Sequence, residues 1–376
     1  METNLIRLGD CVLCNPTVKL TKGQLYSLID IDKIEIGRKF VTKKSLVSYS
    51  GQSGYKFEDG DTLMARITPC LENGKMAVAK IEDKGIGSTE LFVFRNREGV
   101  TDKEFVYYLF KQQYIRNLAA NSMTGASGRQ RADLKFVKRI KLNLPLLPIQ
   151  HRIASILSTY DMLIENNTKR IRLLEKMAEN LYKEWFVRFR FPGHEKVEME
   201  NGLPKGWKYV NFGKLSPIVT GKKDANFASP NGKYKFFTCS KADLMADSYS
   251  FDCFAIILAG NGDLNVKLYK GQFEAYQRTY VLTPYDISHI YISYYTIQSE
   301  LDRLLVGAAG AVIKFLTKGM IEKIKIVVPD QSLLRKFNIM LDANFKIRQN
   351  LIAQNTLLAR QRDLLLPRLM SGKLEV

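Results

Sequence analysis

The chain has 376 residues, which is long enough for two or three domains with cores of their own. Its apolar fraction of 45% and charged fraction of 25% are typical of a globular protein, and no apolar run approaches the roughly 18 residues that span a membrane. The N-terminal residues lack the charged and apolar regions of a secretory signal, so the sequence predicts a cytoplasmic protein.

The strongest bulk feature is the charge, since 57 Lys and Arg face 38 Asp and Glu and leave a net charge of +19. This excess is uneven, because residues 146–200 carry nine basic and eight acidic groups and are nearly neutral. Positive charge concentrated on the segments that flank a neutral one indicates a polyanion partner, most often nucleic acid. The alternative is that the charge serves solubility alone.

The sequence carries none of the common catalytic or metal-binding motifs. It lacks a phosphate-binding loop, a dinucleotide-binding glycine motif and the paired-histidine spacing of a metalloprotease. Cys11 and Cys14 form a C-x-x-C pair, but no second pair and no nearby His completes a zinc site. We therefore expect free thiols, no metal and a binding protein rather than an enzyme.

Residues 1–148 are predicted to form a first module of mixed strands and helices. A helix is expected at 102–120, followed by a basic, glycine-containing loop at 125–131. Strands are expected at 39–47, 62–67, 76–81, 91–95 and 140–145.

Residues 149–190 contain no Gly and no Pro, and their apolar residues recur every three or four positions, which predicts one long helix. Pro145 and Pro148 stand before it, because proline is not tolerated in a helix interior. At ~1.5 Å per residue, about 40 residues make a rod of roughly 60 Å. Such a rod is expected to serve as a spacer that packs on a second helix of similar length.

Residues 191–331 repeat the plan as a second module, and residues 332–376 as a second long helix with a tail. Strands are expected at 233–237, 253–258, 279–282 and 324–329, a helix at 287–305 and a small-residue loop at 307–311. The second long helix is expected from Ser332 to Leu366, where Pro367 stops it.

A shift of 184 residues aligns the two halves. It places Pro145 on Pro329 and Leu157 on Leu341, and separately the segment that starts at Arg7 resembles the one that starts at Asn211. An internal repeat of this kind decides the architecture. We predict an α+β chain with a pseudo-two-fold repeat, in which two globular α/β modules are separated by two long antiparallel coiled-coil helices.

The residues expected to pair the helices lie on one apolar stripe of each. They are Ile153, Ile156, Tyr160, Ile164, Ile171, Leu174 and Leu181 in the first helix, and Phe337, Leu341, Phe345, Leu351 and Leu358 in the second.

Candidate DNA-binding residues are the Lys, Arg, Asn and Gln side chains that stand in turns and loops. These residue types bind phosphates and the edges of bases in the major groove. They are Arg66, Asn73, Lys75, Arg129, Gln130 and Arg131 in the first module, and Lys222, Lys223, Lys235, Asn261 and Arg278 in the second. Asn261 stands in a glycine turn, and its alternative role is to adopt a positive φ there.

Four stretches, in this order, resemble the specificity subunits of type I restriction-modification enzymes. Residues 60–75 (GDTLMARITPCLENGK) resemble a signature of their target-recognition domains, and residues 144–154 (LPLLPIQHRIA) resemble the start of their central helix. Residues 203–207 (LPKGW) resemble the start of their second recognition domain, and residues 365–374 (LLPRLMSGKL) resemble their C-terminus. The second junction, at 329–333, departs from the pattern because it lacks the second Pro and the His-Arg-Ile-Ala run.

The resemblance implies a non-catalytic subunit that recognises an asymmetric, bipartite site in double-stranded DNA. It further implies two methylation subunits docked on the helices, and restriction subunits added for cleavage. S-adenosylmethionine, ATP and magnesium would belong to those partners and not to this chain. The alternative function is a coiled-coil scaffold that binds nucleic acid without sequence preference.

Overall fold

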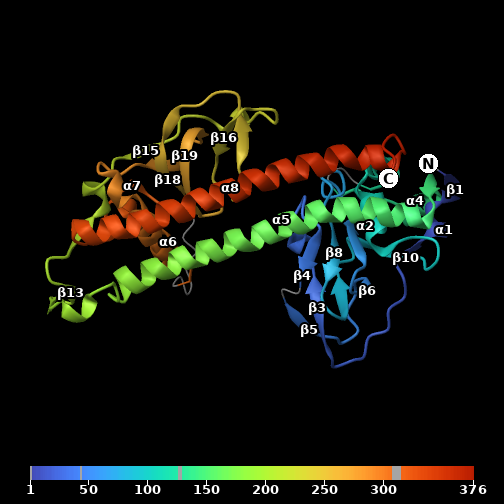
Figure 1. Cartoon of the computed structure of the whole chain (residues 1–376), viewed down its shortest axis with the longest axis horizontal. Helices are drawn as coiled ribbons and strands as arrows, with labels where there is room; N and C mark the ends of the chain where they lie inside the picture. The colour runs from blue at the N-terminus through green and yellow to red at the C-terminus, as the bar shows by residue number, and fades with distance from the viewer. Residues whose placement is uncertain (1, 43–44, 126–128, 307–314) are drawn as a thin grey trace. The chain divides into compact units, whose positions relative to one another are not determined.

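The computed structural model describes residues 2–42, 45–125, 129–306 and 315–376. The chain divides into two compact units. The first unit comprises Met1–Ile171 and Asn350–Val376, and the second comprises Arg172–Gln349. Each unit contains one of the two modules together with parts of both long helices, which are drawn in green and red in Figure 1.

The first unit is built on a five-stranded sheet with the order β2-β10-β7-β8-β4, in which only the β4–β8 pair is parallel. A four-stranded sheet of order β5-β3-β9-β6 and the antiparallel pair β1–β11 complete the strands. The strands are β1 Thr3–Arg7, β2 Val12–Cys14, β3 Leu25–Ile29, β4 Phe40–Thr42, β5 Leu46–Ser48, β6 Lys56–Glu58, β7 Thr62–Ala65, β8 Met76–Lys80, β9 Lys84–Gly87, β10 Leu91–Asn96 and β11 Lys141–Pro145. The short helices are α1 Leu8–Cys11, α2 Lys103–Lys111, α3 Gln113–Ala120 and α4 Leu134–Arg139.

The second unit is built on a six-stranded sheet with the order β15-β20-β18-β19-β16-β17, in which only the β16–β19 pair is parallel. The antiparallel pairs β14–β21 and β12–β13 lie outside it. The strands are β12 Met199–Glu200, β13 Leu203–Pro204, β14 Lys208–Asn211, β15 Ile218–Thr220, β16 Tyr234–Phe237, β17 Leu244–Ala246, β18 Phe251–Ala259, β19 Val266–Ala275, β20 Thr279–Leu282 and β21 Lys325–Val328. The helices include α6 Ile290–Val306 and α7 Lys318–Glu322.

The two modules share one topology, which confirms the predicted internal repeat. Strands β2, β10, β7, β8 and β4 correspond in sheet order and pairing sense to β15, β20, β18, β19 and β16. The hydrogen bonds repeat as well: the Leu8 N–H donates to the Ile140 carbonyl at 2.8 Å, and the Phe212 N–H donates to the Ile324 carbonyl at 2.8 Å. The pairs 140/324 and 8/212 are the positions at which the sequence halves had been aligned.

The helix expected at 102–120 is interrupted. Helix α2 ends at Lys111, and α3 begins at Gln113, because Gln112 adopts an extended backbone with φ −60° and ψ 129°. Its periodicity of apolar residues continues through the break, which is why the sequence did not reveal it. The strand expected at 39–47 is likewise two strands, β4 and β5.

The two long helices are α5, Leu147–Tyr182, and α8, Gln331–Met370. A π-helical turn at Lys183–Val187 (η2) extends α5. Pro148 lies in the first turn of α5, where its missing N–H costs nothing. The prediction that Pro367 stops the second helix was wrong, because α8 continues through it to Met370. So close to the end of a helix, proline removes only one of the last hydrogen bonds.

The start of each long helix explains both the likeness and the difference of the two junctions. At α5, the buried Gln150 donates to the carbonyls of Val100 and Pro145 at 3.0 and 2.8 Å and accepts from the Asp102 N–H at 3.0 Å. The corresponding residue of α8, Leu334, is apolar and fully buried. There the Asp330 carboxylate caps the helix by accepting from the Leu333 N–H at 2.9 Å.

Within each unit, the parts of α5 and α8 that it contains pack antiparallel. In the first unit, Asp161 contacts Arg362, and Asn167 contacts Gln354. In the second unit, the Asn344 amide donates to the Leu174 carbonyl at 3.0 Å, and the rings of Trp185 and Phe337 lie 5.8 Å apart. In both units, therefore, residue numbers rise along α5 as they fall along α8.

The stripe that packs differs from the predicted one at Ile156, which is 36% exposed. Leu157, one residue further on, is fully buried beside Ile153, so the prediction of Ile156 as a pairing residue was wrong. A step of four from Ile153 keeps closer to one helix face than a step of three. The other predicted pairing residues are buried or half-buried: Ile153, Tyr160, Ile164, Ile171, Leu174, Leu181, Phe337, Leu341, Phe345, Leu351 and Leu358. Phe345 packs against Phe254 and Tyr291 of the module.

The first unit also buries an ion pair between the long helices. Asp161 of α5 and Arg362 of α8 each have a side chain that is 1% exposed, and they bind each other directly. The second oxygen of Asp161 accepts from the Tyr108 hydroxyl of α2 at 2.6 Å, and Lys39 donates to that hydroxyl at 3.2 Å. Lys39 in turn binds Glu104. One polar network thus joins the module to both helices.

We predict that Arg362→Ala destabilises the first unit by about 3–5 kcal/mol, because it leaves the buried Asp161 carboxylate without a counterion. Hydrogen exchange on the full-length chain should show lost protection in peptides of the first unit. Both tryptophans, Trp185 and Trp207, lie in the core of the second unit, so their fluorescence reports that unit separately during unfolding.

The matched control is Arg360→Ala, which removes an exposed arginine of the same helix. The joint replacement of Asp161 by Leu and Arg362 by Met should recover most of the loss, because neither charge is then left unpaired. Equal exchange in Arg362→Ala and Arg360→Ala would contradict the assignment.

Candidate nucleic-acid interface

In the first unit, two loops that are far apart in sequence form one surface. The loop at 66–75 follows β7, and the second loop precedes α4. The Ala132 N–H donates to the Arg66 carbonyl at 2.8 Å, and the Thr68 N–H donates to the Gln130 carbonyl at 3.0 Å. An antiparallel bridge joins Ile67 to Arg131. The predicted candidates from both segments therefore lie on neighbouring backbones.

The candidates in this surface differ in how free they are. Asn73 and Arg129 are exposed, and Lys75 and Gln130 are half-buried. Arg66 is half-buried with its guanidinium 5.1 Å from the centre of the Phe92 ring, and it donates to the Ala132 carbonyl at 3.3 Å. Arg66 thus serves the packing of the loop, which was its alternative role. The predicted loop at 125–131 is described only at its ends, since residues 126–128 lie outside the described ranges.

Arg131 is held by a residue that the sequence did not single out. Its Nε and Nη2 atoms donate to the two carboxylate oxygens of Glu90 at 2.8 and 2.7 Å. Glu90 immediately precedes β10, and its carbonyl accepts from the Arg66 N–H at 2.9 Å. The hydrogen bonds from Arg131 lower the pKa of Glu90 below its ordinary 4.5 despite partial burial. The pair fixes the second loop against the start of β10.

The second unit presents the corresponding surface. The Gly260 N–H donates to the Arg278 carbonyl at 2.9 Å, the Leu316 N–H donates to the Gly260 carbonyl at 2.8 Å, and an antiparallel bridge joins Asn261 to Phe315. The predicted small-residue loop at 307–311 lies outside the described residues.

Lys222 and Lys223 lie beside the turn that carries Arg278. The Gln277 N–H donates to the Lys223 carbonyl at 2.9 Å, and a bridge joins Lys223 to Tyr276. A Cβ on Gly221 would stand 2.0 Å from the Ala275 carbonyl oxygen, so only glycine lets the segment approach this closely. Lys222 and Arg278 are exposed, while the Lys223 ammonium lies 4.3 Å from the centre of the Phe227 ring.

Two candidates are placed differently from expectation. Asn261 does not take the positive φ of its turn; Gly262 does, with φ 65°, while Asn261 pairs in the bridge to Phe315. Lys235 is bound to Asp243 at 2.6 Å, and Lys267 shares that carboxylate at 2.8 Å. Burial alone would raise the pKa of Asp243, but hydrogen bonds from both ammonium groups lower it. Lys235 thus has a structural partner in this unit.

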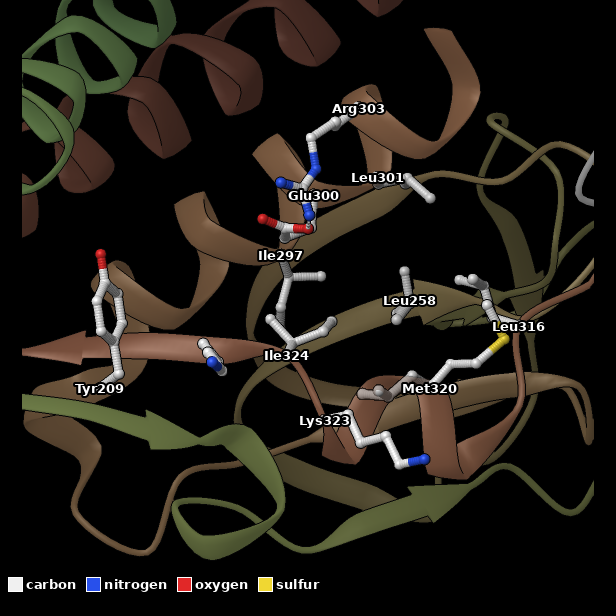
Figure 2. Close-up of a pocket in the computed structure, with 12 residues that line it drawn as sticks. Tyr209, Leu258, Ile297, Glu300, Leu301, Arg303, Leu316, Met320, Lys323 and Ile324 are labelled. Atoms are coloured by element: carbon white, nitrogen blue, oxygen red, sulfur yellow. Dashed lines mark hydrogen bonds and ion pairs between the residues drawn. The ribbon is translucent and has the colours of Figure 1, made fainter. Parts of the chain in front are cut away.

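An apolar cavity of about 660 Å³ also lies in the second unit (Figure 2). Its walls include Leu258, Ile297 and Ile324, and Arg303 at its border binds Glu300 at 2.5 Å. The described lining residues supply no paired acid and base or nucleophile. Across the described ranges, moreover, no cluster of three His, Cys, Asp or Glu could hold a metal. Burial raises the pKa of the Cys11 thiol to about 12 and of Cys14 to about 11, so both stay protonated at neutral pH.

Comparison with known proteins agrees with this geometry. Residues 20–176 match the model of the type I restriction modification DNA specificity domain. The family expected from the sequence, the specificity subunits of type I restriction-modification enzymes, is confirmed. Members of this family are non-catalytic components, as expected for this chain.

The similar proteins include the specificity subunit of the type I restriction enzyme EcoDI from Escherichia coli. It is 35% identical over 176 residues, which is 46% of this chain and 39% of that protein. The MjaIX specificity subunit from Methanocaldococcus jannaschii is 27% identical over 317 residues, which is 75% of this chain and 72% of that protein. The match therefore spans about two fifths of the first relative's length and nearly three quarters of the second's.

The fold is confirmed by a crystal structure of a type I restriction-modification S subunit from M. genitalium. It is 16% identical, has a TM-score of 0.54, and the match covers 98% of this chain and 96% of that one. The predicted α+β architecture with long helices is therefore correct. Within the described parts of the chain, no helix is both long and apolar enough to cross a membrane.

We predict that Glu90 titrates below pH 4.5 in the full-length chain, because the guanidinium of Arg131 stabilises its charged form. The stabilisation is present above the ordinary pKa and is lost as the pH falls through the lowered one. NMR of carboxyl-labelled glutamate, with Glu90 assigned from a Glu90→Gln variant, measures the midpoint.

Arg131→Met should bring this midpoint back towards 4.5, whereas the control Arg129→Met should leave it unchanged. A midpoint that stays the same in Arg131→Met would show that the Glu90–Arg131 pair is absent in solution.

Proposed function

We propose that the chain recognises an asymmetric, bipartite site in double-stranded DNA, with each unit reading one half-site. The observation that carries this proposal is that the two loop surfaces share one backbone frame but present different side chains. Equivalent hydrogen bonds hold residues 66, 90 and 132 in the first unit and 260, 278 and 316 in the second. Two readers built alike but lined differently suit two different half-sites.

The helices are proposed to set the gap between the half-sites. Both α5 and α8 contribute residues to both units, and neither contains Gly or Pro between its first and last turns. A continuous helix advances ~1.5 Å per residue, while DNA advances ~3.4 Å per base pair. The length of the paired helices would then translate directly into the number of unread base pairs.

The proposed gap can be tested by removing seven residues from α5 and seven facing residues from α8. Two helical turns are lost, so each apolar stripe keeps its face while the helices shorten by ~10 Å. We expect the preferred gap to shorten by about two to three base pairs and both half-sites to stay the same, as measured by selection of bound duplexes from a random library. Changed half-sites with an unchanged gap would contradict the spacer role, and equal binding to all sequences would contradict specific recognition and favour the non-specific scaffold.

We further propose that methylation subunits dock on the exposed apolar residues of the long helices, and that restriction subunits join that complex. In the first unit, Leu357 and Leu364 of α8 are 59% and 61% exposed and lie seven residues apart, on one helix face. In the second unit, Leu173 and Met177 of α5 are 61% and 63% exposed and lie four residues apart. Exposed apolar residues gathered on one face are typical of protein interfaces.

Under this proposal S-adenosylmethionine, ATP and magnesium serve the partner subunits, and the complex acts in the cytoplasm, where the DNA of the cell lies.

A variant that carries Leu357→Glu and Leu364→Glu should bind the methylation subunit at least about tenfold more weakly, because each leucine would lose roughly 1.5–3 kcal/mol of burial. Calorimetric titration of the full-length chain with that subunit measures the affinity. The matched control replaces both leucines by Met, which keeps the apolar area. Equal affinity of the Glu and Met variants would place the interface elsewhere.

A further inference from the structure

We propose that Arg278 is a specificity-determining residue of the second unit that contacts a guanine in its half-site, and that its counterpart Glu90 gives the first unit a different readout. This inference rests on the proposed function of the two units. It concerns which side chains at the shared backbone frame distinguish bases.

The equivalence of Glu90 and Arg278 comes from the backbone and not from residue type. Each residue immediately precedes the strand that pairs with β7 or β18: Leu91 faces Ala65, and Thr279 faces Ala259. Each carbonyl then accepts the next N–H of the facing chain, from Arg66 or from Gly260, at 2.9 Å. The two residues occupy one position of a repeated structure.

The bridging partners are equivalent in the same way. Residues 67 and 131 are bridged in the first unit, and residues 261 and 315 are bridged in the second. The position of Arg131 is therefore taken by Phe315, and that of Ile67 by Asn261. These are the same pairs that a shift of 184 residues gives for the second loop.

The charges at the two frames differ in consequence. In the first unit, the guanidinium of Arg131 is occupied by both oxygens of Glu90. In the second, Arg278 is exposed, and no described residue forms an ion pair with its side chain. Phe315, at the place of Arg131, is 62% exposed and carries no charge. The nearby Asp224 carboxylate accepts from the Gln277 amide at 2.9 Å.

An exposed arginine without a carboxylate has its donors available for a ligand. The guanidinium fork matches O6 and N7 of guanine, which is the commonest specific contact between a side chain and a base. The turn that carries Arg278 is fixed by backbone hydrogen bonds on both sides, through Gly260 and through Lys223, so its backbone is already ordered. Lys222, exposed beside it, suits a phosphate instead.

The test uses the full-length chain assembled with its methylation subunits and a library of random duplexes, from which bound sequences are selected and counted. Arg278→Ala should reduce the preference for guanine at one position of one half-site by about 5- to 150-fold and leave the other half-site unchanged. Arg278→Lys should lose the same preference while keeping the dependence of affinity on salt, because it retains the charge but not the fork. The control Lys222→Ala should weaken all sequences alike and reduce the salt slope by about one.

Unchanged preferences in Arg278→Ala would overturn the inference while leaving the proposed function intact. So would uniform weakening of all sequences that Arg278→Lys restores, because that result identifies a phosphate contact. If the wild-type complex itself selects no sequence, the proposed function fails, and the inference fails with it. Unaltered circular dichroism and thermal unfolding of the variants exclude a loss of folding as the cause.

Discussion

The buried pair of Asp161 and Arg362 constrains the first unit more than any other polar contact described. Two charges withdrawn from water must satisfy each other, because an unpaired one costs several kcal/mol. Asp161 lies on α5, Arg362 lies on α8, and the Tyr108 hydroxyl of α2 binds the same carboxylate. A slip of either helix would separate the charges, so the pair specifies one alignment of the helices where apolar residues alone would tolerate several. Both carboxylates near Arg362, Asp161 and Asp363, raise its pKa despite the burial, so it stays charged.

The second unit solves the same problem with less charge. Tyr291 of α6 donates to Asp342 of α8 at 2.7 Å, so again a tyrosine of the module binds a carboxylate on the long helix that follows it. Arg348 binds Glu175 at 2.6 Å, although Glu175 is half exposed, and a solvated pair of this kind contributes little. Aromatic packing takes the larger share, since Phe186 and Trp185 both contact Phe337. The repeat thus conserves the attachment of module to helix while it changes the chemistry.

Much of the fold could be predicted from periodicity and punctuation. The expected strands at 76–81, 91–95 and 279–282 correspond closely to β8, β10 and β20, and the Gly- and Pro-free stretches correspond to α5 and α8. The break at Gln112 and the passage of α8 through Pro367 could not be predicted, because both depend on how the ends of elements pack rather than on local pattern. Asp161 and Arg362 were missed for a related reason: a search for an apolar stripe passes over charged residues, even where their pairing allows burial.

The candidate interface shows the same division. Loop residues such as Arg131, Lys222 and Arg278 could be singled out because basic residues beside glycine turns tend to be exposed. Their partners could not, because Glu90 lies some 40 residues before Arg131 in sequence and meets it only through the fold. Comparison of the two halves offered the missing signal, since the shift of 184 residues already placed Phe315 on Arg131. A repeat whose frame is constant and whose exposed residues vary is the physical basis for assigning one half-site to each unit.

The most direct measurement of this account is the mapping of methylated bases in the genome of cells that express the chain together with its methylation subunits. The account predicts one asymmetric motif made of two different specified segments with an unspecified gap of fixed length between them. A single continuous motif, a palindrome read identically by both units, or methylation without any motif would contradict it.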